Sequence, residues 1–169
     1  MIEVLDDFAT PSYHRELLEY LGSNRVEWFY QDNIAKREGK PILGHQGFGH
    51  MLIHFDDPMP QTPLKSLILP LLFQIQDYLK SPKILRARLD MTMYNPNHLQ
   101  HGTHVDMDGP HWSAVYYVNE SDGDTIIGDT RVAPKPNRVV VFDGTIEHTG
   151  MSPAYHPNRI IINSNYDVW

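Results

Sequence analysis

The chain has 169 residues, enough for one well-buried domain and too few for two domains of ordinary size. Its formal net charge of -7 at pH 7 argues against a phosphate-binding surface, so no nucleic-acid partner is expected. The absence of cysteine excludes disulfides and thiolate ligands, so any metal must be bound by His, Asp or Glu.

No segment of the sequence is typical of export or of a membrane. The start, MIEVLDD, is acidic where a secretory signal would be basic. The longest apolar run, 67–75, is interrupted by Pro70 and Gln74 and does not approach the ~18 to 20 residues that a membrane span needs. We therefore expect a soluble cytoplasmic protein with no membrane partner. No heptad seam is present to indicate an oligomeric state.

Two helices are expected in the N-terminal half. In 10–22 a Thr-Pro pair supplies an N-cap and a first-turn proline, an apolar stripe follows, and a glycine ends the helix. A second Thr-Pro pair opens a helix over 62–79, in which Pro70 either produces a kink or marks a restart. Between the two helices, 28–57 is expected to form loops and one or two edge strands, for example at 51–55.

From residue 84 the hydrophobic period changes to two. Apolar and polar residues alternate across 85–94, which predicts a half-buried strand. Further strands are predicted at 112–119, 124–127, 138–142 and 159–165. Short strands separated by Gly, Pro, Asn and Asp predict a mainly β fold with flanking helices and an antiparallel jelly-roll or barrel core. We expect a single domain, with 1–83 as a helical and mixed N-terminal support and 84–169 as the core that carries the site.

The functional pattern that stands out is His104-Val105-Asp106, followed much later by His148. Side chains two residues apart point the same way in a β-strand, so His104 and Asp106 can bind one ion from a single short strand. Two histidines and one carboxylate are the ligand set of a non-haem iron(II) centre. They leave neighbouring positions open for a chelating cosubstrate and O2.

Ten histidines make a chance His-x-Asp pattern plausible, and the alternative is that these three residues bind no metal. His156 is a competing third ligand, but prolines on both sides of it indicate a loop tip. His98 and His101 would need a helix to align with His104, which the nearby proline and glycine disfavour, so both are expected in a loop near the mouth. The histidines expected on the surface or at the entrance are His45, His50, His54 and His111.

Arg159 opens a predicted strand and points to the same face as Ile161 and Asn163. On the inner face of an apolar strand an arginine requires an anion, and its planar fork pairs with a carboxylate. A 2-oxo acid with a second carboxylate would chelate the metal at one end and meet Arg159 at the other. The alternative is a structural ion pair with an Asp or Glu.

A set of residues across 89–169 carries a resemblance to a known family. They are Tyr94, His104-Val105-Asp106, Tyr116-Tyr117-Val118-Asn119, Gly123-Asp124-Thr125, Pro134, Arg138 to Phe142, His148, Pro153-Ala154-Tyr155 and Arg159. Together they resemble the iron(II)- and 2-oxoglutarate-dependent oxygenases, and within them the prolyl 4-hydroxylase-like group. The resemblance implies a double-stranded β-helix that uses Fe(II), 2-oxoglutarate and O2.

The same resemblance implies a role for each matching residue. His104, Asp106 and His148 would form the catalytic metal site, and Arg159 would hold the C5 carboxylate of 2-oxoglutarate. Tyr94 and Tyr117 would supply hydroxyl donors in the cosubstrate pocket, with core packing as the alternative for both. The implied reaction couples decarboxylation of 2-oxoglutarate to hydroxylation of a substrate C–H bond.

The resemblance leaves the substrate open, as a small molecule or a peptide. Collagen-type members usually carry Lys where Arg159 stands and a Gly-Gly pair where this chain has only Gly123. One rival is a nucleic-acid demethylase with the same cofactors, for which a local basic patch would be needed. Its candidate residues are Lys36, Arg37, Lys40, Arg86 and Arg88. The other rival is a non-oxygenase, cupin-like metal-binding protein, which would have little use for Arg159.

Overall fold

The large sheet of the protein brings together strands from both ends of the chain. The computed structural model describes residues 1–35, 42–55, 57 and 60–168. Within them, the strand order of the large sheet is β1-β8-β5-β10-β4-β3-β2. The strands are β1 (Ile2–Leu5), β2 (Phe29–Gln31), β3 (Gly47–His54), β4 (Ile84–Met93), β5 (Trp112–Tyr117), β8 (Arg138–Asp143) and β10 (Asn158–Tyr166). All of their pairings are antiparallel.

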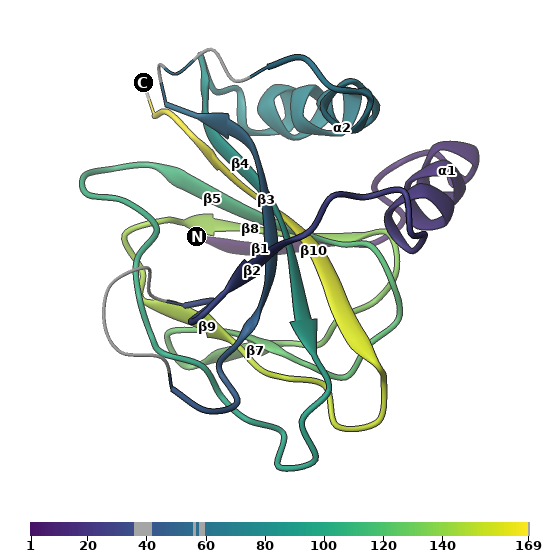
Figure 1. Cartoon of the computed structure of the whole chain (residues 1–169). Coiled ribbons are helices and arrows are strands. Elements are labelled where there is room, and N and C mark those ends of the chain that lie inside the picture. The colour runs from purple at the N-terminus through teal and green to yellow at the C-terminus, as the bar shows by residue number, and fades with distance from the viewer. Residues whose placement is uncertain (36–41, 56, 58–59, 169) are drawn as a thin grey trace.

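A second, smaller sheet lies across from the inner face of the first (Figure 1). Its strand order is β7-β6-β9, formed by β6 (Thr125–Ile127), β7 (Thr130–Val132) and β9 (His148–Gly150). An apolar cluster packs between the two sheets at one end, where Tyr117 and Phe142 of the large sheet meet Ile127 of the small one. Two antiparallel sheets packed face to face form the jelly-roll type of core, so the mainly β prediction is confirmed.

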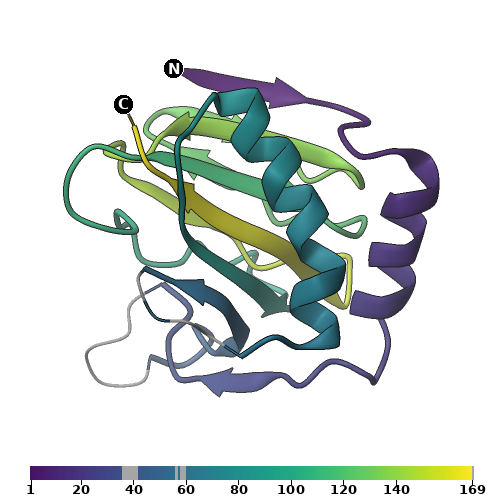
Figure 2. The same cartoon turned by 90° about the horizontal axis from the view of Figure 1, so that it is seen from above.

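The two helices cover the outer face of the large sheet. Figure 2 shows α2 (Pro63–Leu79) crossing over the strands and α1 (Pro11–Leu21) beside one end of the sheet. Leu71 and Ile75 of α2 are fully buried against outward-facing sheet residues such as Leu89 and Ile162. This apolar contact is the main core of the protein, and burying each such side chain contributes roughly 1.5–3 kcal/mol.

The ends of the helices follow the sequence signals. The Thr62 hydroxyl accepts a hydrogen bond from the backbone N–H of Lys65 at 3.0 Å and so caps α2. The helix is continuous through Pro70, which rules out a restart there. Thr10 precedes α1 but makes no capping hydrogen bond with its side chain. No helix in the described part of the chain is long and apolar enough to cross a membrane.

The strands β4 and β10 place the polar residues of the fold. Their apolar residues face the helices, while Arg86, Asp90 and Thr92 face inward and are only 7, 9 and 4% exposed. The prediction of a half-buried β4 was therefore wrong in one respect, because its polar face is covered by the small sheet and the loops instead of by water.

Antiparallel pairing then sets inward-facing residues of β4 and β10 beside one another, as Arg159 beside Thr92 and Asn165 beside Arg86.

The remaining strand predictions agree with the structure to within a few residues. The strands that the sequence did not predict are β1, β7 and β9, which are short.

Candidate metal centre

His104 and His148 are held side by side by the backbone. The N–H of His104 donates to the carbonyl of His148 at 3.0 Å, and the N–H of His148 donates to the carbonyl of His104 at 2.9 Å. This isolated β-bridge connects a loop residue to β9, although the two histidines lie 44 positions apart. The bridge therefore places the Cα atoms of the two histidines next to each other without the help of a metal.

Both imidazoles present the same nitrogen to the site. Nδ1 of His104 lies 3.0 Å from the carbonyl oxygen of Gly102, and Nδ1 of His148 lies 3.1 Å from that of Ile146. A carbonyl can only accept, so each Nδ1 carries the hydrogen and each Nε2 keeps a lone pair for a metal. Burial lowers the pKa of His104 and favours the neutral form that a ligand must have.

Asp106 completes the ligand set. One of its oxygens lies 4.0 Å from Nε2 of His104, the other lies 3.5 Å from Nε2 of His148, and the three ligand atoms all lie within 4.8 Å of one another. Burial alone would raise the pKa of Asp106, but the neighbouring His148 and Arg86 hold it well below its usual value. The carboxylate is therefore charged and available to a cation.

The expected strand at His104 is present only as that single bridge, and Asp106 lies in a bend. The alternation still holds, because Val105 between them is 40% exposed while the side chain of Asp106 is 2% exposed. Two imidazole nitrogens and one carboxylate this close together fit Fe(II) with open positions. Among the described residues, no other His, Asp or Glu group has the closeness that a metal site needs.

The other histidines considered from the sequence have different partners. Nδ1 of His156 lies 2.8 Å from the carboxylate of Asp122, so this histidine is engaged elsewhere. His98 bonds to the carbonyl of Asp122 at 2.8 Å. His111 is 2% exposed beneath Gly144 and does not lie at an entrance. The prediction for His111 was therefore wrong.

His101 is closer to the site than the sequence indicated. It is 5% exposed, lies 3.0 Å from the Ser152 hydroxyl and 3.2 Å from Nδ1 of His45, and lines the cavity beside the metal ligands. Burial, with help from His45 and Arg159, lowers the pKa of His101 to about 4. It is therefore a neutral polar group of the cavity wall.

Arg159 lines the same cavity, which has a volume of about 520 Å³ with the solvent at its mouth included. It is 4% exposed, donates to the hydroxyl of Thr125 at 2.6 Å and lies over the ring of Tyr117 at 5.5 Å. Gly123 permits this approach, because a Cβ there would lie 3.0 Å from Cδ of Arg159.

No described Asp or Glu lies within ion-pair distance of Arg159, and its buried Nε has no hydrogen-bond partner. An isolated buried cation is costly, so the arrangement favours a ligand carboxylate over a structural ion pair.

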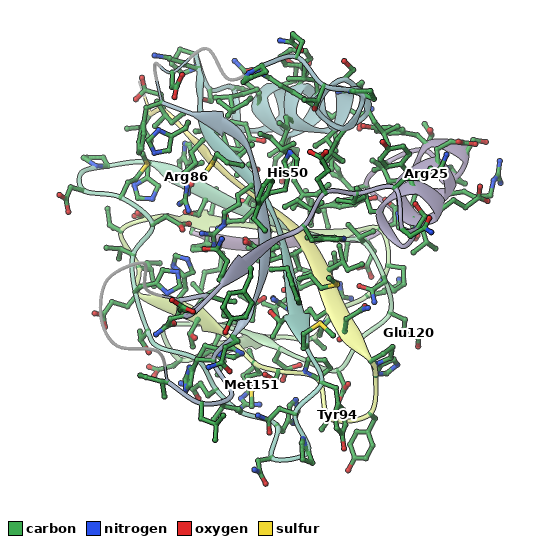
Figure 3. The ribbon with its side chains drawn as sticks, in the orientation of Figure 1. Arg25, His50, Arg86, Tyr94, Glu120 and Met151 are labelled. Carbon is green, nitrogen blue, oxygen red and sulfur yellow. The ribbon has the colours of Figure 1, made fainter. Side chains whose placement is uncertain are left out.

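The two tyrosines are placed differently from each other. Tyr117 is fully buried beneath Arg159, and its hydroxyl donates to Thr125 at 2.6 Å. Tyr94 is 53% exposed and does not line the cavity, and Figure 3 shows it at the lower edge of the molecule with its ring directed outward. The structure does not bring Tyr94 to the site, because β4 ends at Met93 and Thr92 occupies the inward position beside Arg159.

The basic patch considered for a nucleic-acid partner is not formed by its described members. Arg86 donates to Asp106 at 2.9 Å and Nε of Arg88 lies 2.7 Å from Asp90, both inside the fold. The remaining candidates, Lys36, Arg37 and Lys40, lie outside the described residues.

Sequence reasoning did not identify the residues that hold Asp106. Besides Arg86, the amides of Asn163 and Asn165 approach its carboxylate at 3.3 and 3.0 Å. The available signal was the run of alternate polar residues on both β4 and β10, which is unusual for two strands at the centre of a sheet.

Comparison with protein-family models and with curated proteins finds no match. Solved structures do match. A 2OG-Fe(II) oxygenase family oxidoreductase from Burkholderia pseudomallei gives a TM-score of 0.70 at 12% identity, covering 98% of this chain and 84% of that one.

A second match is a prolyl hydroxylase from Trichoplax adhaerens in complex with a hypoxia inducible factor peptide fragment. Its TM-score is 0.67 at 14% identity, and the match covers 98% of this chain and 83% of that one. A prolyl-4-hydroxylase from Pseudomonas putida gives a TM-score of 0.62 at 15% identity, covering 99% of this chain and 92% of that one. At such identities the likeness concerns the fold alone, and the chain has the fold of the 2OG-Fe(II) oxygenases and prolyl hydroxylases, as its sequence resemblance implied.

Proposed function

We propose that this protein is an Fe(II)- and 2-oxoglutarate-dependent dioxygenase, a hydroxylase of the prolyl 4-hydroxylase-like kind. It would couple the decarboxylation of 2-oxoglutarate by O2 to hydroxylation of a substrate C–H bond. The fold is that of structures with this chemistry, and the ligand set His104, Asp106 and His148 suits a hydrated divalent iron.

The observation that carries the proposal is the pairing of two features in one cavity. His104 and His148 line it, and so does the buried Arg159. A dicarboxylate with a 2-oxo group has a chelating end for the metal and a carboxylate for the arginine. Neither feature alone would select this cosubstrate.

The residues of the chain bind and orient. Arg159 would hold the distal carboxylate, with Thr125 fixing the guanidinium and Tyr117 supporting it from below. Arg86 and Asn165 keep Asp106 in place for the metal. Bound Fe(II), with O2 and 2-oxoglutarate, would supply the oxidising chemistry that no side chain here provides.

The substrate is proposed only as a class, a small molecule or a peptide. The Trichoplax adhaerens structure contains a peptide fragment, which is consistent with a peptidyl substrate for this fold. No described feature favours the nucleic-acid demethylase, since Arg86 and Arg88 face inward. Arg159 disfavours the cupin-like metal-binding protein, because such a protein would have no use for an arginine buried without an acidic partner.

The test is an anaerobic titration of the protein with Fe(II) and then 2-oxoglutarate, followed by visible absorbance. A charge-transfer band from the chelated complex is expected, and its absence would contradict the proposal. Iron affinity should fall between neutral and acidic pH, once the pH drops below the pKa of His104, which burial lowers from its usual value, because protons then compete for the ligand nitrogen. An iron affinity that did not change across that pH range would count against His104 and His148 as ligands.

A further inference from the structure

A second cavity adjoins the metal ligands, and Arg159 is not among its lining residues. It is lined by His104 and Asp106 and by β3 and β4 residues, among them His54, Arg86 and Arg88. Arg88 and His104 also line the cavity that holds Arg159, so the two cavities meet beside the metal site. If 2-oxoglutarate occupies the first cavity, the second is the space from which a substrate reaches the metal.

Arg88 is a residue of this second cavity with hydrogen-bond donors that can meet a ligand. Its side chain is 14% exposed and its ion pair with Asp90 uses Nε, at 2.7 Å. Among the described residues Asp90 is its acidic partner, so the terminal nitrogens, Nη1 and Nη2, can meet a ligand. Arg86, two residues earlier on β4, donates hydrogen bonds to Asp106 and Asn165 and is therefore occupied.

The charges of the two cavities point to the sign of that ligand. Their described walls carry three arginines, Arg86, Arg88 and Arg159, against two carboxylates, Asp90 and Asp106. Fe(II) adds two positive charges, which the two carboxylates of 2-oxoglutarate balance. Among the described residues one positive charge is therefore left over, and a singly charged anion would neutralise it. A phosphate, with its higher charge, would fit this balance less well beside Asp90.

A structural role alone does not account for Arg88. A buried ion pair contributes little net stability, because desolvation offsets most of the attraction between the charges. The pair here lies on the wall of a cavity next to the metal ligands instead of inside an apolar core. The planar guanidinium group of Arg88, with its terminal nitrogens free, is suited to binding a carboxylate.

We propose that Arg88 binds a carboxylate of the substrate in the cavity beside His104, so that the protein acts on a carboxylate-bearing compound. This inference rests on the proposed function, since the second cavity is a substrate site only if the first holds 2-oxoglutarate. Arg88 is then a determinant of substrate specificity, distinct from Arg159.

The test uses the anaerobic complex of the full chain with Fe(II) and saturating 2-oxoglutarate. The probes are free L-amino acids, short aliphatic acids and capped peptides containing Glu, each beside its carboxamide counterpart. Binding is measured by the perturbation of the visible band of the complex. At least one acid is expected to bind about tenfold or more tightly than its carboxamide. Preference among free acids would identify a small-molecule substrate, and preference among the peptides an acidic side chain.

Arg88→Gln should remove the preference for the acid while changing the Kd for 2-oxoglutarate by no more than about threefold, since Arg159 is intact. The matched control is Arg131→Gln, because Arg131 also pairs with an aspartate, Asp124, but is 57% exposed outside both cavities. If Asp90 without its partner prevents folding, Arg88→Gln/Asp90→Asn removes both charges and should likewise lose the preference.

The outcomes separate the two proposals. No visible band in the unaltered protein means that the proposed function has failed. A normal band with no preference for acids, or an equal preference in Arg88→Gln, overturns the role of Arg88 alone. A loss of 2-oxoglutarate binding in Arg88→Gln as large as in Arg159→Gln would also overturn it, because Arg88 would then serve the cosubstrate.

Discussion

The two faces of the large sheet are both buried, yet they are built from opposite kinds of residue. The outer face, under α1 and α2, is apolar, with Leu89 and Ile162 at its centre. The inner face carries charged and amide side chains on β4 and β10, including Asp90 and Arg159, each less than 10% exposed. A chain that only needed stability would gain little from burying these groups.

The comparison separates stability from ligand binding. The outer face stabilises the fold by removing apolar area from water. The inner face holds polar groups whose partners are incomplete, such as Nε of Arg159. Substitutions on the outer face should therefore change stability, and those on the inner face should change binding.

The largest effect is expected from His148→Ala, which removes a proposed metal ligand at the inner face. The charge-transfer band with Fe(II) and 2-oxoglutarate should be lost, while the thermal unfolding of the metal-free protein changes little. His156→Ala is the matched control, because His156 pairs with Asp122 and should leave the band intact. A band that survived in His148→Ala would show that the metal binds elsewhere.

Leu71→Ala tests the outer face. Leu71 is fully buried in α2, so truncation should reduce the free energy of unfolding by about 2–5 kcal/mol in urea denaturation. The affinity of the folded protein for 2-oxoglutarate should stay the same. Leu18→Ala in α1, at a side chain that is 37% exposed, should cost much less. A large change in cosubstrate affinity in Leu71→Ala would break the separation of the two faces.

Arg159→Gln tests the inner face at the residue proposed to bind the cosubstrate carboxylate. Loss of a charge-assisted pair should raise the Kd for 2-oxoglutarate by about 10- to 100-fold, measured by the same visible band. The metal-free protein should be as stable as before or more so, since an unpaired buried charge is gone. Arg131→Gln serves as the control. Unchanged affinity in Arg159→Gln would favour the cupin-like alternative.

The smallest effect concerns the protonation of His101. Its pKa is lowered to about 4 in the folded protein, from 6.5 for an unperturbed histidine, so the unfolded state takes up a proton first as the pH falls. The stabilising contribution of the neutral ring is present above pH 6.5 and is lost progressively between 6.5 and about 4.

Between pH 7 and 5.5 this loss should amount to about 1 kcal/mol in the metal-free protein, and His101→Gln should abolish that part of the pH dependence. Urea midpoints of both proteins across this range provide the measurement. Parallel curves for the two proteins would show that His101 does not titrate as expected.

The sequence predicted β4 and β10 well because a period of two is a local property. It could also indicate that Arg159 and Asn163 share a face, since that follows from strand geometry alone. It did not reveal that Asn165 and Arg86 both hold Asp106, because these contacts depend on the pairing of strands 79 residues apart. Tyr94 shows the converse, since a residue matched by resemblance lies outside the cavity when its strand ends one residue earlier.

The sequence by itself determined the chemistry of the candidate ligands, their order along the chain and the two-residue period of the strands that carry them. The tertiary structure decided which face of β4 is enclosed, which histidines have partners elsewhere and that Arg88 borders both cavities. The physical reason is that side-chain alternation is fixed by covalent geometry, whereas burial and electrostatic environment arise only when distant strands pair and the second sheet covers them.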